Sequence, residues 1–106
     1  MEWVPIVLLL AVAQDPLRDS DPYVVQAAGW NAFEAKAPDA LPLLIAQLKN
    51  PSHIARMGAA VGLQGYAGLA RQYLPQMEQA LANEPVGPTR STLEATIKIV
   101  KEGRLP

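Results

Sequence analysis

The chain contains three apolar runs of similar length, each opened by a proline. They begin at Val4-Pro5, Leu41-Pro42 and Leu74-Pro75, and each lasts for about ten residues, which suits one helix. Each run ends at a turn that contains proline, and a second segment of helical pattern follows that turn. Recurrence at intervals of about 30 to 37 residues is typical of helical-repeat arrays.

The repetition predicts an all-α fold, an α-solenoid of three helical hairpins in a single domain. The hairpins are expected at about 3–36, 40–67 and 72–102. Together they contain about six helices, at 3–14 and 22–36, at 40–49 and 52–67, and at 72–83 and 89–102. Gly68 and Gly103 follow the second and third hairpins, where glycine suits a left-handed helix end.

The first apolar run permits two interpretations. Ala11-Val12-Ala13 before Gln14 looks like a signal-peptidase site, and the run is too short to span a bilayer. A secretory signal begins with positive charge, however, and the only charged residue at this end is Glu2. The first helix of hairpin one is therefore the favoured interpretation, and with it a cytoplasmic location, while secretion stays open.

Composition restricts the function mainly by exclusion. The 106-residue chain has a net charge of −1, which gives no electrostatic reason to expect a nucleic acid or an anionic membrane as partner. It contains no cysteine, so disulfides, zinc–thiolate sites and thiol catalysis are excluded.

The second helices of the hairpins carry a more specific pattern. Residues 25–33 read VQAAGWNAF and residues 55–63 read ARMGAAVGL, and 92–100 keeps the apolar spacing. With its preceding Asp-Pro or Asn-Pro turn, this pattern resembles the HEAT-repeat family, whose motif is V-R-x-x-A-A-x-A-L. The small residues predict close helix packing, with Phe33 and Leu63 filling the seam and Trp30 buried.

The resemblance also implies a structural ion pair. In HEAT-like arrays a turn aspartate and a helix arginine bond to one another across adjacent repeats, and here these are Asp21 and Arg56. We therefore predict that the two side chains lie close together, and that loss of Arg56 lowers stability. The alternative is that Arg56 binds an anionic ligand on the concave surface.

Candidates for catalysis are few. His53 lies in the first turn of a predicted helix, without a nucleophile or second ligand at a recognised spacing, and a solvated or capping role explains it. The acidic residues between 15 and 21 lack the remaining positions of a calcium loop. The sequence therefore predicts no catalytic residue, no metal site and no cofactor, and a protein that is not an enzyme.

The expected function is a non-catalytic scaffold that binds a protein partner. Helical arrays usually bind on the concave surface, which is lined by the second helices. Mixed charges there favour a protein or peptide over nucleic acid. The candidate partner-binding residues are Gln26, Lys36, Gln64, Arg90, Glu94, Lys98 and Lys101.

A second functional interpretation is a structural accessory. Residues 28–37 and 41–44 resemble the HEAT-like tail that follows the catalytic domain in some bacterial sulfatases. That family's nucleophile is a modified cysteine, which this chain lacks, so the resemblance implies a tail that packs on a catalytic domain. The first run, 4–12, is apolar nearly all round, which instead allows self-association into a homo-oligomer.

Overall fold

The computed structural model describes residues 15–103, and every regular element in that range is helical. The α-helices are α2 (Pro22–Ala35), α3 (Ala40–Gln47), α4 (His53–Gln64), α5 (Leu74–Ala82) and α6 (Gly87–Glu102), and two 3-10 helices are η1 (Asp15–Arg18) and η2 (Ala67–Tyr73). The predicted all-α class is confirmed. Five α-helices are found rather than six, and the helix predicted at 3–14 lies outside the described residues.

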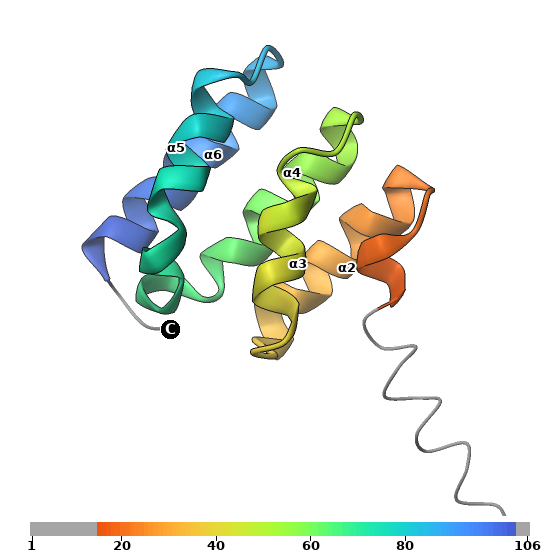
Figure 1. Ribbon diagram of the computed structural model, residues 1–106, viewed down its shortest axis with the longest axis horizontal. Coiled ribbons are helices and arrows are strands. Elements are labelled where there is room, and N and C mark those ends of the chain that lie inside the picture. Colours follow the sequence, from red (N-terminus) through yellow and green to blue (C-terminus); the bar gives the residue numbers. More distant parts are fainter. Residues whose placement is uncertain (1–14, 104–106) are drawn as a thin grey trace, which may run out of the picture.

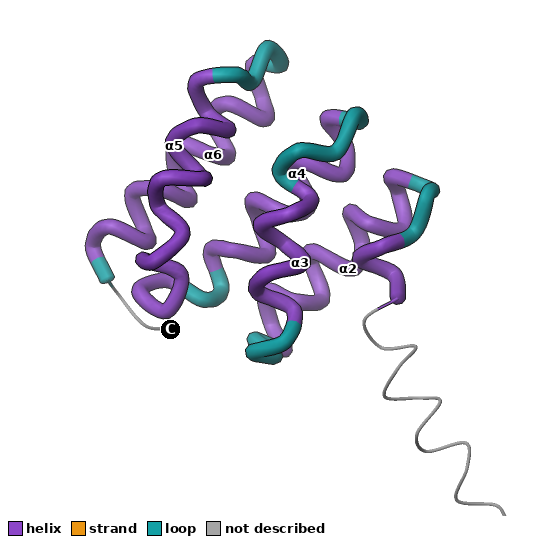
Figure 2. The backbone as a smooth tube through the Cα atoms, viewed as in Figure 1, coloured by secondary structure: helices purple, strands orange, loops and turns teal. Residues whose placement is uncertain are grey.

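The helices lie side by side along the longest axis of a molecule of 49 × 28 × 18 Å. α3 and α4 form one hairpin and α5 and α6 another, each joined by a short turn, and η2 connects the two hairpins (Figures 1 and 2). α2 lies at one end of the row, and α5 and α6 lie at the other. α4 occupies the centre, where it packs against both α2 and α6.

Local sequence explains where most helices begin and end. Asp21 precedes Pro22, and its Oδ1 accepts a hydrogen bond from the Tyr23 N–H at 2.9 Å, which caps α2. Ser52 caps α4 in the same way. Gly103 ends α6 with a φ of 70°, as predicted.

The predicted role of Gly68 is wrong. It lies inside η2, and the left-handed residue at this junction is Ala67, with a φ of 47°. α4 ends at Gln64 rather than at 67, and Tyr66 is buried with its hydroxyl donating to the Ala37 carbonyl. Gly65 and Gly68 have low helix propensity, and the hydrogen bond of Tyr66 holds the chain at the point where α4 ends.

Close packing of small residues joins α4 to its neighbours, as predicted. Gly29 of α2 faces Gly58 of α4 so closely that a Cβ on Gly29 would overlap the Gly58 carbonyl. At the α4–α6 seam, the hydroxyl of Thr96 hydrogen-bonds to the Ala60 carbonyl at 2.9 Å. Leu63 is fully buried beside these contacts.

Two large aromatic residues do not occupy the predicted core positions. Trp30 is 51% exposed and Phe33 is 39% exposed. α2 turns Val25, Gly29 and Ala32 toward the rest of the protein, and Trp30 lies about 100° around the helix from Gly29, on the other side. The described residues therefore leave about half of the Trp30 side chain open.

Candidate functional site

A groove runs between α3 and α5, on the side of the molecule opposite the α4–α6 seam. It has a volume of about 850 Å³, which is in the range of ligand sites in proteins. It exists because α4 and α6 pack directly on each other, whereas α3 and α5 hardly touch. Its lining residues are Ile45, Ala46, Leu48, Lys49, Asn50, Pro51, Arg56, Gln76, Gln79, Ala80, Asn83, Glu84 and Pro85.

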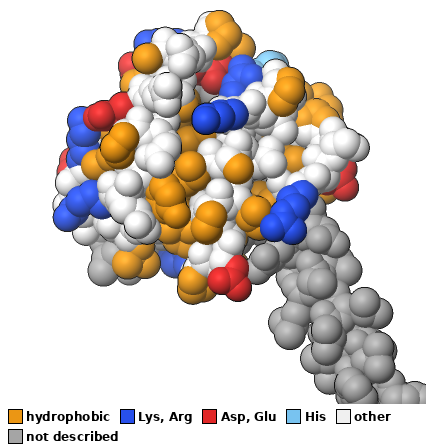
Figure 3. Space-filling view, in the orientation of Figure 1, with side chains coloured by type: hydrophobic (Ala, Val, Ile, Leu, Met, Phe, Trp, Pro, Cys, Tyr) orange, Lys and Arg blue, Asp and Glu red, His pale blue; other side chains and the backbone are white. Residues whose placement is uncertain are grey.

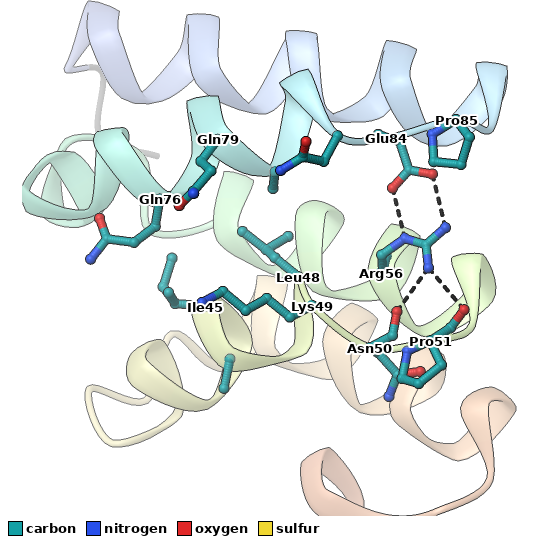
Figure 4. Close-up of a pocket in the computed structure, with 13 residues that line it drawn as sticks. Ile45, Leu48, Lys49, Asn50, Pro51, Arg56, Gln76, Gln79, Glu84 and Pro85 are labelled. Atoms are coloured by element: carbon teal, nitrogen blue, oxygen red, sulfur yellow. Dashed lines mark hydrogen bonds and ion pairs between the residues drawn. The ribbon is translucent and has the colours of Figure 1, made fainter.

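The groove has an apolar floor and a polar rim. Leu48 is buried at the bottom, with Ile45 and Ala80 half-buried beside it. Figure 4 shows Gln76 and Gln79 extending from α5, opposite Lys49, which lies just after α3. Figure 3 shows hydrophobic side chains gathered in the middle of this face, with charged groups mainly around them.

The groove is closed at one end by a buried ion pair. Arg56 Nε lies 2.7 Å from Glu84 Oε1 and Arg56 Nη2 lies 2.9 Å from Glu84 Oε2, a two-pronged contact (Figure 4). The third nitrogen, Nη1, donates to the carbonyls of Asn50 and Pro51 at 2.8 and 3.0 Å. The arginine thus ties the turn of one hairpin to the turn of the next.

Both side chains of the ion pair are largely removed from solvent. The Arg56 side chain is 15% exposed and the Glu84 side chain 2%. Hydrogen bonds from Arg56 hold the pKa of Glu84 below its ordinary value, although burial acts in the opposite direction. The Val86 N–H, which donates to Oε2 at 3.2 Å, adds to the lowering. Glu84 is therefore bound as a carboxylate at neutral pH.

This lowered pKa predicts a pH dependence of stability. A depressed pKa in the folded state contributes stability above the unfolded-state value of about 4.3, and the contribution is lost as pH falls through the folded-state pKa. We expect the free energy of unfolding of the wild type to exceed that of Glu84→Gln at pH 7, and the difference to shrink in acid. Urea unfolding of both proteins across this range measures it, and a difference that does not change with pH would contradict it.

The predicted pair of Asp21 and Arg56 is not formed. Asp21 uses its carboxylate to close its own turn, and Arg56 extends toward the following hairpin, where Glu84 receives it. The prediction that Arg56 serves the architecture rather than a ligand agrees with these contacts, but its partner was wrong. Glu84 was not predicted as the partner of Arg56, because the pattern Asn83-Glu84-Pro85 indicates only a turn.

The three turns nevertheless share one geometry. Oδ1 of Asp19, Oδ1 of Asn50 and Oε2 of Glu84 each accept a hydrogen bond from the N–H of the N-cap residue two positions later. Glu84 is thus the counterpart of Asp19, whereas Asp21 is itself an N-cap. Comparison of the acidic and amide residues two positions before each N-cap could have revealed Glu84.

The predicted partner-binding residues do not form one surface. Gln64 lies at the α4–α6 seam, where its Nε2 donates to Thr96 Oγ1 at 3.2 Å. Arg90 Nη1 donates to the carbonyls of Leu81 and Glu84 at 2.9 and 3.0 Å. Gln26 of α2 and Lys36, at its left-handed end, are half-buried at the opposite end of the row.

The remaining three predicted residues lie together at the end of the row. Glu94, Lys98 and Lys101 are exposed on α6 and line a shallow hollow of about 380 Å³ that also includes Leu81 of α5. Lys101 Nζ pairs with the Glu78 carboxylate at 3.0 Å, and both side chains are about half exposed. His53 is exposed at the start of α4, as predicted.

Comparisons with protein-family models, with curated proteins and with solved structures find no match to this chain. Within residues 15–103, no three His, Cys, Asp or Glu side chains come together in a way that could hold a metal ion. None of the helices described has the length and apolar character needed to cross a membrane.

Proposed function

We propose that this chain is a non-catalytic helical-repeat scaffold of the HEAT type, and that it binds an extended peptide segment of a protein partner. The binding site is the groove between α3 and α5, rather than the concave surface lined by the second helices. The observation that carries this proposal is the combination of a buried apolar floor with an amide-rich rim in one groove.

The chemistry of the rim supports a peptide as the ligand. Gln76, Gln79 and Asn83 are exposed, and their amides both donate and accept hydrogen bonds. An extended peptide presents alternating N–H and C=O groups, which such amides match. Its apolar side chains would contact Leu48 and Ile45 on the floor. Lys49, on the rim, favours an acidic residue in the peptide.

The state of Glu84 supports a binding role rather than a catalytic one. It is the one carboxylate among the residues that line the groove, and both of its oxygens are bound to Arg56. A carboxylate held in this way is a poor general base, because proton uptake would break the ion pair. The lining residues include no histidine or hydroxyl side chain that could act as a nucleophile.

The shared turn geometry supports the repeat architecture. Asp19, Asn50 and Glu84 occupy the same position in successive turns, and Arg56 and Arg90 each bind a carbonyl of the turn before their own helix. Such equivalence is expected if the helical pairs are copies of one unit stacked in the same way.

Selection from a random-peptide display library against the full chain tests the function. Gln79→Trp fills the groove from an exposed position, and Ala82→Trp places the same ring on α5 outside the groove. We expect selected peptides to bind the wild type and Ala82→Trp alike, and Gln79→Trp at least about tenfold more weakly, a loss of about 1.4 kcal/mol. No enriched peptide, or equal loss in both variants, would contradict the proposal.

A further inference from the structure

The exposed side of α2 carries two large aromatic residues. Tyr23 is 64% exposed and Trp30 is 51% exposed, and Ala27 lies exposed between them on the same helix face. Large aromatic side chains grouped on a surface mark interaction sites more often than isolated exposed residues do. The charged residues at this end are the exposed Arg18, Asp19, Asp21 and Glu34 and the half-buried Lys36. The α2 end of the row is thus aromatic, with carboxylates in slight excess.

The opposite end of the row has an apolar hollow. Between α5 and α6 it contains Leu81 and Ile97, and the charged side chains around them carry both signs, namely Glu94, Lys98, Lys101 and Glu102. Arg90 lies on the same helix, close to the turn that joins α5 to α6. The α5–α6 end is therefore apolar at its centre, and Arg90 lies at its edge.

Arg90 is the structural equivalent of Arg56 but lacks its carboxylate partner. In both residues Nη1 donates to two carbonyls that precede the helix; for Arg90 these are Glu84 in the turn and Leu81 near the end of α5. Arg56 then uses Nε and Nη2 to hold Glu84 of the next turn. No hydrogen bond joins Nε or Nη2 of Arg90 to any residue in the described part of the chain.

Asp19 lacks the complementary partner. It occupies the turn position that Glu84 occupies, two residues before the N-cap of the next helix, and its Oδ1 accepts from the N-cap N–H as Glu84 Oε2 does. Glu84 receives an arginine from the preceding hairpin, whereas no arginine within residues 15–103 reaches Asp19. One end of the row thus presents the acceptor, and the other the donor, of the contact that joins neighbouring hairpins inside the protein.

We propose that copies of this chain stack head to tail, with the α2 end of one copy on the α5–α6 end of the next. Asp19 of one copy binds Nε and Nη2 of Arg90 in its neighbour, as Glu84 binds Arg56 within the chain. Tyr23 and Trp30 cover the hollow around Leu81 and Ile97. A second copy is the occupant because both halves of the contact, matched in charge, exist on one chain. Since the two surfaces differ, the contact does not close on itself and allows an open series.

Sedimentation velocity of the full chain over a concentration series tests this proposal. Trp30→Glu blocks the α2 end and Lys98→Glu blocks the α5–α6 end, while Lys49→Glu makes the same charge change away from both. We expect the wild type and Lys49→Glu to form dimers and longer species as concentration rises. Each blocked variant should remain monomeric, and an equimolar mixture of the two should form dimers that grow no further.

A separate variant tests the role of the Arg90 guanidinium group. Arg90→Lys keeps the charge and a donor for the turn carbonyls but removes the two-pronged contact, so it should raise the dissociation constant about tenfold. Circular dichroism checks that each variant keeps the helical fold. A wild-type chain that stays monomeric at millimolar concentration would overturn the proposal. Growth of the mixed blocked variants beyond dimers would also overturn it, because it would require a different interface.

Discussion

Replacement of Arg56 by alanine is expected to lower the free energy of unfolding by about 3–5 kcal/mol. The substitution leaves the Glu84 carboxylate buried without its partner, and it also removes the donor to the carbonyls of Asn50 and Pro51. A buried charge that loses its counterion is among the most costly changes in a small domain. Urea or guanidinium unfolding, followed by circular dichroism at neutral pH, measures the loss.

Two further variants show whether the buried environment is the cause. The double variant Arg56→Met/Glu84→Leu removes both charges and should be considerably more stable than Arg56→Ala, because no unpaired charge remains. Lys101→Ala breaks the exposed pair with Glu78, and it should change the free energy of unfolding by no more than about 0.5 kcal/mol. Equal effects of Arg56→Ala and Lys101→Ala would contradict the account of a desolvated pair that joins two turns.

Replacement of Gly29 by alanine is expected to cost about 2–3 kcal/mol of stability. Alanine favours a helix over glycine by about 1 kcal/mol, so propensity alone predicts the opposite sign. The added Cβ, however, would overlap the carbonyl of Gly58, and a backbone atom cannot rotate away as a side chain can. α2 and α4 would have to move apart along their whole contact. Thermal and urea unfolding of the variant measure the effect.

Gly87 provides the matched control for this prediction. It is the first residue of α6, and a Cβ there would meet no atom within 4 Å apart from its chain neighbours. Gly87→Ala should therefore cost no more than about 1 kcal/mol, which arises from the helical conformation directly before Pro88. If Gly29→Ala were as stable as Gly87→Ala, the close approach of α2 and α4 would be wrong.

The helical elements were predictable from local signals. Pro22 at the start of α2, Ser52 before α4 and Gly103 after α6 act through capping and backbone preference, which operate over a few residues. The spacing of small residues also predicted the contact of α2 with α4. The predictions that failed are those that depend on which side of a helix packs against the rest of the protein. Trp30 matched a motif position, but its burial requires a neighbour that a motif does not supply.

The site was less predictable than the fold. The resemblance implied an ion pair for Arg56, but the choice between Asp21 and Glu84 depends on which hairpin the arginine faces. That direction is set by tertiary packing. The groove was not foreseen, because it results from α3 and α5 staying apart while α4 and α6 touch. No pattern in the sequence of Gln76, Gln79 or Lys49 indicates that these residues face one another.

The central claim is that the groove between α3 and α5 holds a peptide. Titration of the isotopically labelled chain with a selected peptide, followed by amide chemical shifts in NMR, tests it most directly. We predict the largest shifts at Leu48 and Lys49, at the end of α3, and at Gln79 and Asn83, at the end of α5, with α6 little affected. Shifts concentrated on the exposed residues of α6, with the groove unchanged, would contradict it.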